Sequence, residues 1–205
     1  DVCSSDLTMH HNSLYDNNFQ EKFKEELKEF DKLTSGKSRG FRAPTFSLNT
    51  NTKWAIDDLK NQNYIYDSSI VPAKTKLYGF SEAERGPYLI SSDNLIKNNK
   101  DGALIEFPLL ATKFLGKKIP SGGGFFVRLL PLRTIEKGIE KYQKLGIPST
   151  FYIHSWELTP EFMPSLPLPF IDKFVTYYNL KNALPKMNKL IEKYEFTSFE
   201  RYIKN

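Results

Sequence analysis

The sequence predicts an α/β fold in which most strands run parallel. Amphipathic helical segments alternate along the chain with short runs of β-favouring residues, an order typical of parallel strands joined by helices. Two of these runs end on a polar residue, Asp67 and His154, as expected for a barrel whose site lies at the carboxyl ends of its strands. The chain has 205 residues, of which 40% are hydrophobic, so one domain with its own core is expected.

The first predicted element is a helix over residues 17–33, ended near Gly36. Apolar residues recur on it every three or four positions, which places them on one helical face: Phe19, Phe23, Leu27, Phe30 and Leu33. Residues 41–44 predict a short strand that leaves into a loop. A second, shorter helix and its candidate N-cap residues follow: Trp54, Ile56 and Leu59, with Thr50, Asn51 or Thr52 as the cap.

Residues 64–67 predict a strand that ends on an acidic side chain, and residues 104–107 predict a strand closed by Pro108. The intervening residues 74–103 are rich in loop-forming types. A triple glycine at 122–124 precedes residues 125–129, which fit either a strand or the start of a helix. No Gly-Lys-Ser/Thr follows these glycines, so they predict a tight turn or a close backbone approach instead of a phosphate-binding loop.

A helix is next predicted from an apolar stripe that Gly146 and Pro148 end: Ile135, Ile139, Tyr142 and Leu145. Residues 150–154 favour β-structure, and a proline-rich loop follows them. A last helix is predicted from the apolar residues near the end of the chain: Leu184, Met187, Leu190, Ile191 and Tyr194.

The composition excludes several classes of function. The net charge is +5, but lysines and glutamates are interleaved, as in residues 21–26, which indicates a solvated helix face and no nucleic-acid partner. A single cysteine excludes an intrachain disulfide and a cysteine-based zinc cluster. No apolar run approaches the ~18 residues that a membrane span requires.

Residues 1–7 are expected to be foreign to the protein. They correspond to the translation of sequencing-adapter DNA, GAC GTG TGC TCT TCC GAT CT, and there is no initiator methionine. We interpret them as an artefact fused to a truncated gene, with a natural polar leader as the alternative. On this interpretation the cysteine is not native and localisation signals cannot be inferred.

Three histidines are candidates for chemistry: His10, His11 and His154. His10 and His11 are either exposed residues without a role in a site, or one of them is a metal ligand. At most one can be a ligand, because successive side chains of a strand face opposite ways. His154 is either a buried histidine held by a backbone carbonyl or a general acid or base, since imidazole titrates near neutral pH.

Two charged residues lie in mostly apolar surroundings. Asp67 either caps the turn after its strand or takes part in a site. Arg42 lies between Phe41 and an Ala-Pro pair, and a buried guanidinium requires an acidic partner. The sequence therefore predicts a carboxylate near Arg42.

Four motifs in a fixed order resemble the NodB-type polysaccharide deacetylases of carbohydrate esterase family four. They are GFRAPTFS at residues 40–47, YDSSI at 66–70, PSGGG at 120–124 and FYIHSWEL at 151–158. The branch associated with exopolysaccharide biosynthesis is most similar, with GFRAPSFS, YDSS, P-x-GGG and FYxHPWEL. Ser155 and Thr159 depart from the proline and aspartate usual there. The resemblance covers the chain from about Thr8 onward.

This resemblance implies an incomplete, deformed (β/α) barrel and hydrolysis of N-acetyl groups on amino sugars. It also implies a divalent metal, usually zinc, held by an aspartate and by two histidines of an H-[ST]-x-x-H motif. His11 corresponds to the second histidine, while Leu7 stands where the first would be. The family's upstream Asp-Asp motif, which supplies the catalytic base and a metal ligand, does not occur in this chain.

The resemblance also implies residue roles. Arg42 would pair with the catalytic base, and His154 would protonate the leaving amine. Asp67 would orient His154 or raise its pKa. The backbone N–H of Thr45 would help to stabilise the oxyanion. Two further residues would either wall the acetyl pocket or serve in packing: Ile153 and Trp156.

The predicted function is a metal-dependent hydrolase that removes N-acetyl groups from a bacterial polysaccharide or its precursor, with a carbohydrate as its partner. Residues 8–205 would be the C-terminal part of a single deacetylase domain with a family-specific extension, and a cytoplasmic location is favoured. With only His11 of three metal ligands, the present chain is expected to be inactive. The alternative is a non-catalytic carbohydrate-binding or scaffold protein on the same fold.

Overall fold

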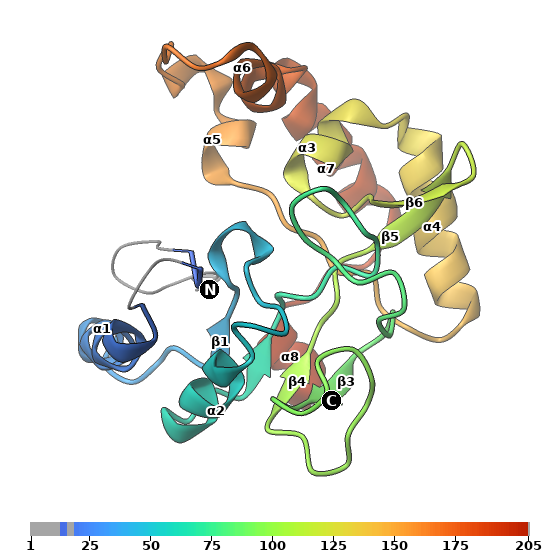
Figure 1. The fold of residues 1–205 in the computed structure, drawn as a ribbon. Coiled ribbons are helices and arrows are strands. Elements are labelled where there is room, and N and C mark those ends of the chain that lie inside the picture. The colour runs from blue at the N-terminus through green and yellow to red at the C-terminus, as the bar shows by residue number, and fades with distance from the viewer. Residues whose placement is uncertain (1–12, 16–18, 205) are drawn as a thin grey trace. The chain divides into compact units, whose positions relative to one another are not determined.

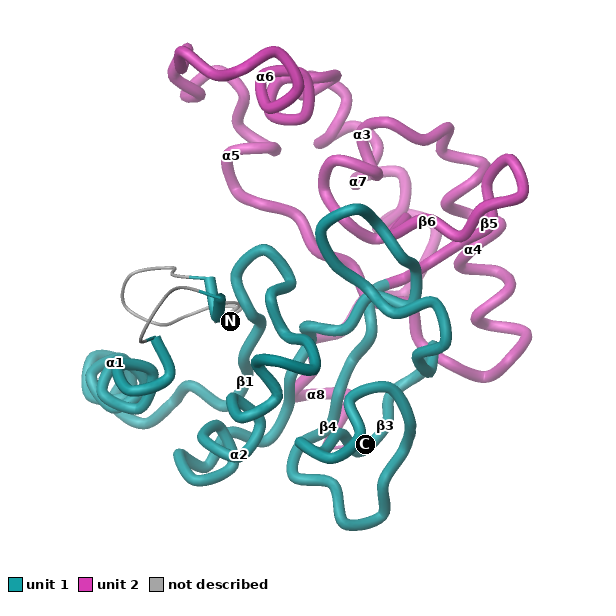
Figure 2. The backbone as a smooth tube through the Cα atoms, in the orientation of Figure 1, with its two compact units in different colours: residues 1–109 teal, residues 110–205 magenta. Residues whose placement is uncertain are grey.

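The computed structural model describes residues 13–15 and 19–204 as a mixed α/β structure with two small sheets (Figure 1). The chain divides into two compact units, residues 1–109 and 110–205 (Figure 2). The predicted mixture of helices and strands is confirmed. Among the described residues the sheets do not close into a barrel, so the deformed barrel, like the single domain over residues 8–205, stays a prediction.

The first unit is built on a four-stranded sheet in the order β1-β2-β4-β3. Its strands are Gly40–Phe41 (β1), Tyr66–Asp67 (β2), Tyr88–Ile90 (β3) and Leu104–Glu106 (β4). The strands β1, β2 and β4 are parallel, as predicted, and β3 pairs antiparallel with β4. The prediction of a loop over residues 74–103 is wrong at β3, whose three residues are ordered by pairing with β4.

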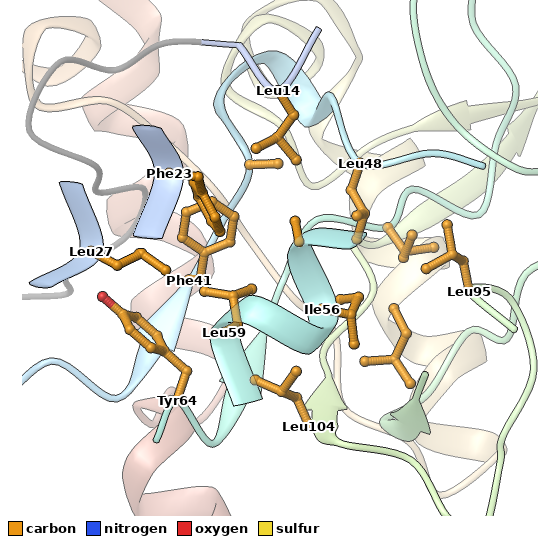
Figure 3. Close-up of a cluster of buried hydrophobic side chains, with 14 of the residues drawn as sticks. Leu14, Phe23, Leu27, Phe41, Leu48, Ile56, Leu59, Tyr64, Leu95 and Leu104 are labelled. Carbon is orange, nitrogen blue, oxygen red and sulfur yellow. The ribbon is translucent and has the colours of Figure 1, made fainter. Parts of the chain in front are cut away.

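Two helices cover the core of this sheet: Phe19–Leu33 (α1) and Trp54–Asn61 (α2). Figure 3 shows Phe23 of α1 and Ile56 of α2 among the buried apolar side chains. The Phe23 ring lies edge-on to Phe41 and Trp54, with centroids 5.5 and 5.4 Å away. As predicted, α1 ends before Gly36, which has a φ of 69°.

The predicted N-cap of α2 is wrong. Lys53 occupies the cap position and makes no side-chain cap hydrogen bond. The hydroxyl of Thr52 is instead used within the preceding loop, where it donates to the Ser47 carbonyl at 2.8 Å and accepts the Asn49 N–H at 2.8 Å. The cap preference of threonine is therefore satisfied by a turn rather than by the helix.

The second unit opens with a hairpin of Ala111–Phe114 (β5) and Lys117–Pro120 (β6). Its two-residue turn holds Leu115 and Gly116 at φ values of 47° and 79°, the left-handed conformations of a tight hairpin turn. The helix Gly124–Leu129 (α3) resolves the alternative left open for residues 125–129. The helix Leu132–Lys144 (α4) follows as predicted and buries Ile135, Ile139 and Tyr142.

The α-helices that follow in this unit are Ser155–Leu158 (α5), Phe170–Tyr177 (α6), Ala183–Lys193 (α7) and Phe199–Lys204 (α8), with short 3-10 helices at Pro160–Phe162 and Leu180–Asn182. The strand predicted over residues 150–154 is wrong, since Tyr152 makes only an isolated parallel bridge with Gly123. The last predicted helix corresponds to α7, which buries Met187 and Leu190. Within the described part of the chain, every helix is too short or too polar to cross a lipid bilayer.

Candidate functional site

Arg42 lies in the first unit, where the carboxyl ends of three parallel strands meet. It follows β1 directly and is 5% exposed. Its Nε donates to the Ser68 carbonyl at 2.8 Å, and a terminal nitrogen donates to the Ser68 hydroxyl at 2.8 Å. That hydroxyl in turn donates to the carbonyl of Phe107, which follows β4, at 2.8 Å. Arg42 and Ser68 therefore link the ends of β1, β2 and β4.

Two carboxyl groups lie beside each other under this link. Asp67 of β2 is in register with Glu106 of β4, and both are fully buried. Burial raises the pKa of both carboxyl groups, and the negative charge of Asp67 raises the pKa of Glu106 further, to well above its ordinary range. Hydrogen bonds from Glu106 and Ser69 and the charge of Arg42 partly oppose the rise in the pKa of Asp67.

The chain after Arg42 is held in an uncommon conformation. Pro44–Phe46 forms a single helical turn in which Thr45 and Phe46 have φ values of 55° and 53°. Non-glycine residues rarely adopt this left-handed region, and a β-branched side chain such as threonine is strained there. Ala43 fixes the start of the turn, because its N–H donates to the Ser69 hydroxyl at 2.8 Å.

His154 belongs to the second unit and is partly buried immediately before α5. Its backbone N–H donates to the Glu157 carboxylate at 3.0 Å. Its ring stacks on the Trp156 ring, with centroids 5.4 Å apart, and its Nε2 contacts the Tyr152 hydroxyl. The imidazole is therefore held between two aromatic side chains.

A buried ion pair fixes the Glu157 side chain. Arg128 of α3 donates through Nε to a Glu157 carboxylate oxygen at 2.8 Å, and both side chains are at most 2% exposed. Arg128 also donates hydrogen bonds to two backbone carbonyls at the end of α6, that of Val175 at 2.9 Å and that of Tyr178. One guanidinium thus joins α3, α5 and the end of α6.

The triple glycine is a point of close backbone approach, as the sequence predicted. A Cβ atom on Gly122 would lie 2.4 Å from the Thr150 carbonyl oxygen, and one on Gly124 would lie 1.9 Å from the Glu157 carboxylate. The Gly122 carbonyl accepts the N–H of Tyr152 at 2.8 Å. The second pair of motifs, at 120–124 and 151–158, therefore interlocks within the second unit.

Replacing Gly122 by alanine should destabilise the chain by about 1–3 kcal/mol, because the new methyl group meets backbone that must shift. Urea unfolding followed by circular dichroism measures the loss. Gly116→Ala is the matched control: its φ is 79° but its Cβ would meet open space, so about 1 kcal/mol is expected there. A Gly122→Ala variant as stable as the parent would contradict the close approach.

The structure brings some predicted site residues together. Arg42, Asp67 and Thr45 lie at one edge of the sheet in the first unit, while His154, Ile153 and Trp156 lie in the second unit. His11 is outside the described residues. Convergence of all of these residues on one cleft stays a prediction.

The predicted zinc site can be compared only with the donors that the structure describes. Over residues 13–15 and 19–204, no three His, Cys, Asp or Glu side chains gather closely enough to hold a metal ion. Asp67 and Glu106 are close, but two carboxyl groups are fewer than the three protein ligands of a catalytic zinc site. Zinc therefore stays a prediction that rests on His11.

Sequence reasoning missed Glu106, Ser69, Arg128 and Glu157. The signal for Glu106 was an acidic residue that shares a strand face with Leu104 and therefore points inward with it. No local pattern indicated that Arg128 would pair with Glu157, which lies 29 residues away. The carboxylate partner predicted for Arg42 stays a prediction. The charge of Arg42 acts on Asp67, where it partly opposes the burial that raises the pKa of that carboxyl group.

A family model described as a domain of unknown function (DUF3473) matches residues 68–204. The match begins at Ser68, includes Glu106 and continues to Lys204 in the second unit. Searches of curated proteins and of solved structures found no match.

Proposed function

This chain belongs to the DUF3473 domain family. We propose that it forms part of a hydrolase that removes N-acetyl groups from amino sugars of a polysaccharide. The family is associated with polysaccharide deacetylase-like proteins. The four motifs that resemble the NodB-type deacetylases also support the proposal, because they interlock in pairs: 40–47 with 66–70, and 120–124 with 151–158.

The observation that carries the proposal is the strained turn at Thr45 and Phe46. Each left-handed residue costs about 1–3 kcal/mol and persists only where the surroundings enforce it. Here Ser68 holds Arg42 and Ser69 holds Ala43, the two residues between the end of β1 and Pro44. The resemblance implies that the Thr45 N–H stabilises an oxyanion, and strained backbone conformations cluster at active sites.

Each residue of the site has its own role in the proposed hydrolysis. The Thr45 N–H stabilises negative charge on the acetyl oxygen, and Arg42 orients the carboxylate base that the resemblance implies upstream. His154 protonates the leaving amine. The contacts of Asp67 support a second role for it in holding Ser69, whose hydroxyl donates to Asp67 at 2.7 Å. A bound zinc ion would polarise the acetyl carbonyl.

Acetate release tests the proposal. The 205-residue chain is compared with a longer product of the same gene that carries the upstream Asp-Asp motif and a histidine at position 7. Both are assayed on N-acetylated amino-sugar oligomers with zinc added. We expect acetate from the longer protein and none above background from the 205-residue chain, because three ligands are needed for a catalytic zinc site.

The other outcomes separate the alternatives. Equal acetate release from both proteins would contradict the assigned metal ligands. Saturable oligomer binding without acetate release from either protein would favour the non-catalytic carbohydrate-binding protein. Neither binding nor release would contradict both functions.

A further inference from the structure

We propose that Glu106 is a positioning residue of this site: its carboxyl group holds residues 67–70 in place, and through them it holds Arg42 and Ala43. What the site does chemically rests on the proposed function, but the contacts that make Glu106 a positioning residue do not. No motif of the resemblance includes this side chain.

The first step runs from Glu106 to the segment after β2, residues 68–70. One carboxyl oxygen of Glu106 accepts the Ile70 N–H at 2.9 Å, and the other lies 3.5 Å from the Ser69 N–H. Both residues are buried in a segment that belongs to no strand. Glu106 therefore supplies from β4 the acceptor that an adjacent strand would otherwise supply.

The second step runs from residues 68–70 to the strained segment around Thr45. The Ser69 hydroxyl donates to Asp67 at 2.7 Å and accepts the Ala43 N–H at 2.8 Å, while Ser68 accepts two hydrogen bonds from Arg42. A displacement of residues 68 and 69 would therefore move both anchors of the segment at once.

The third step concerns charge. Glu106 faces Asp67 from β2 and is in register with Tyr88 of β3, whose hydroxyl donates to the Leu95 carbonyl at 2.5 Å. Arg42 is the cation that acts on Asp67. Two adjacent carboxyl groups in a fully buried position do not both ionise. The pair therefore holds one proton, which joins Glu106 to Asp67 while the Glu106 oxygens still accept backbone N–H groups.

This arrangement makes glutamine the informative substitution. The amide of Glu106→Gln can accept the Ile70 N–H and donate to Asp67, as a protonated glutamic acid does. Glu106→Ala removes both contacts and leaves the two backbone N–H groups and Asp67 without this partner. The exposed Glu29 of α1 provides a matched control, Glu29→Ala.

Amide hydrogen exchange in the 205-residue chain tests the positioning role. In Glu106→Ala, exchange at Ser69, Ile70 and Ala43 should accelerate about tenfold or more, the factor expected when a buried hydrogen bond is lost. In Glu106→Gln and Glu29→Ala, exchange at these amides should stay close to that of the parent. Unchanged exchange in Glu106→Ala would overturn the proposal, as would equal acceleration in both Glu106 variants.

The proton shared by Asp67 and Glu106 can be detected separately by infrared spectroscopy, because a contact without this proton would give no band of a protonated acid. At pH 7 the parent should show the infrared carbonyl band of a buried protonated carboxylic acid, and Glu106→Gln should lack it. Folding raises the pKa of both carboxyl groups, so their contribution to the free energy of unfolding is fully present below the ordinary pKa values, 3.8 for Asp67 and 4.5 for Glu106. This contribution is lost as the pH rises through the raised pKa values of the folded protein.

The free energy of unfolding of the parent should therefore decline with rising pH above this range, and the decline should be smaller in Glu106→Gln. A parent without the protonated band, or with the same pH dependence as Glu106→Gln, would refute the shared proton.

In an acetate-releasing longer protein, Glu106→Ala should lower turnover about 10²-fold through misplacement of the site. Exchange and infrared results stand even if no acetate is released, which separates failure of this proposal from failure of the proposed function.

Discussion

Arg128→Met should destabilise the chain by about 3–5 kcal/mol, because it leaves the Glu157 carboxylate buried without its cation. The substitution also removes the donor from two carbonyls at the end of α6, those of Val175 and Tyr178. Methionine has a similar length and no charge, so the loss measures the ionic and hydrogen-bonding contacts more than packing. Chemical denaturation of the 205-residue chain gives the free energy of unfolding.

Two further variants make this expectation specific. Arg133→Met removes an exposed arginine five residues away and should change the stability by less than about 0.5 kcal/mol. Combining Arg128→Met with Glu157→Met should cost less than the sum of the single changes, since no charge is left unpaired. A loss below about 1 kcal/mol for Arg128→Met would show that the buried ion pair does not hold the second unit together.

The second large effect is expected on turnover. If the longer protein releases acetate as proposed, His154→Ala should lower its turnover by about 10²–10⁴-fold, the range for loss of a general acid. Its zinc content should stay unchanged, because the proposed role is proton donation and not metal ligation. Acetate release and bound zinc are measured on the same preparations.

The neighbouring Ser155 supplies the control for His154. It is exposed at the first position of α5, where proline is well tolerated, and His154 already has the extended backbone, with φ −81° and ψ 149°, that precedes proline. Ser155→Pro should therefore leave turnover close to that of the parent. Loss of zinc in His154→Ala, or turnover within tenfold of the parent, would contradict the assigned role.

Periodicity predicted the long helices because their buried faces are local properties of the sequence. The stripes through Phe23 and through Ile139 place α1 and α4 within a few residues of their observed bounds. The short strands were harder, since each has only two to four residues and depends on a partner from elsewhere in the chain. The hairpin turn at Leu115 was missed because leucine is an atypical residue for a left-handed turn.

The candidate site was predictable only in part. Arg42 and Asp67 attracted attention because they are charged residues beside apolar strands, and the structure places them at one sheet edge. Glu106 was not predicted as a site residue, because only the register between β2 and β4 places it beside Asp67. Register depends on pairing across the sheet, which the local sequence does not encode.

The positive φ angles of Thr45 and Phe46 also have a consequence for evolution. Glycine or asparagine would adopt this backbone more easily than threonine or phenylalanine. Lineages under selection for folding alone would therefore drift toward those residues at both positions. Retention of a β-branched and an aromatic side chain there would indicate selection that outweighs folding stability, a trade-off that enzymes accept near reacting atoms.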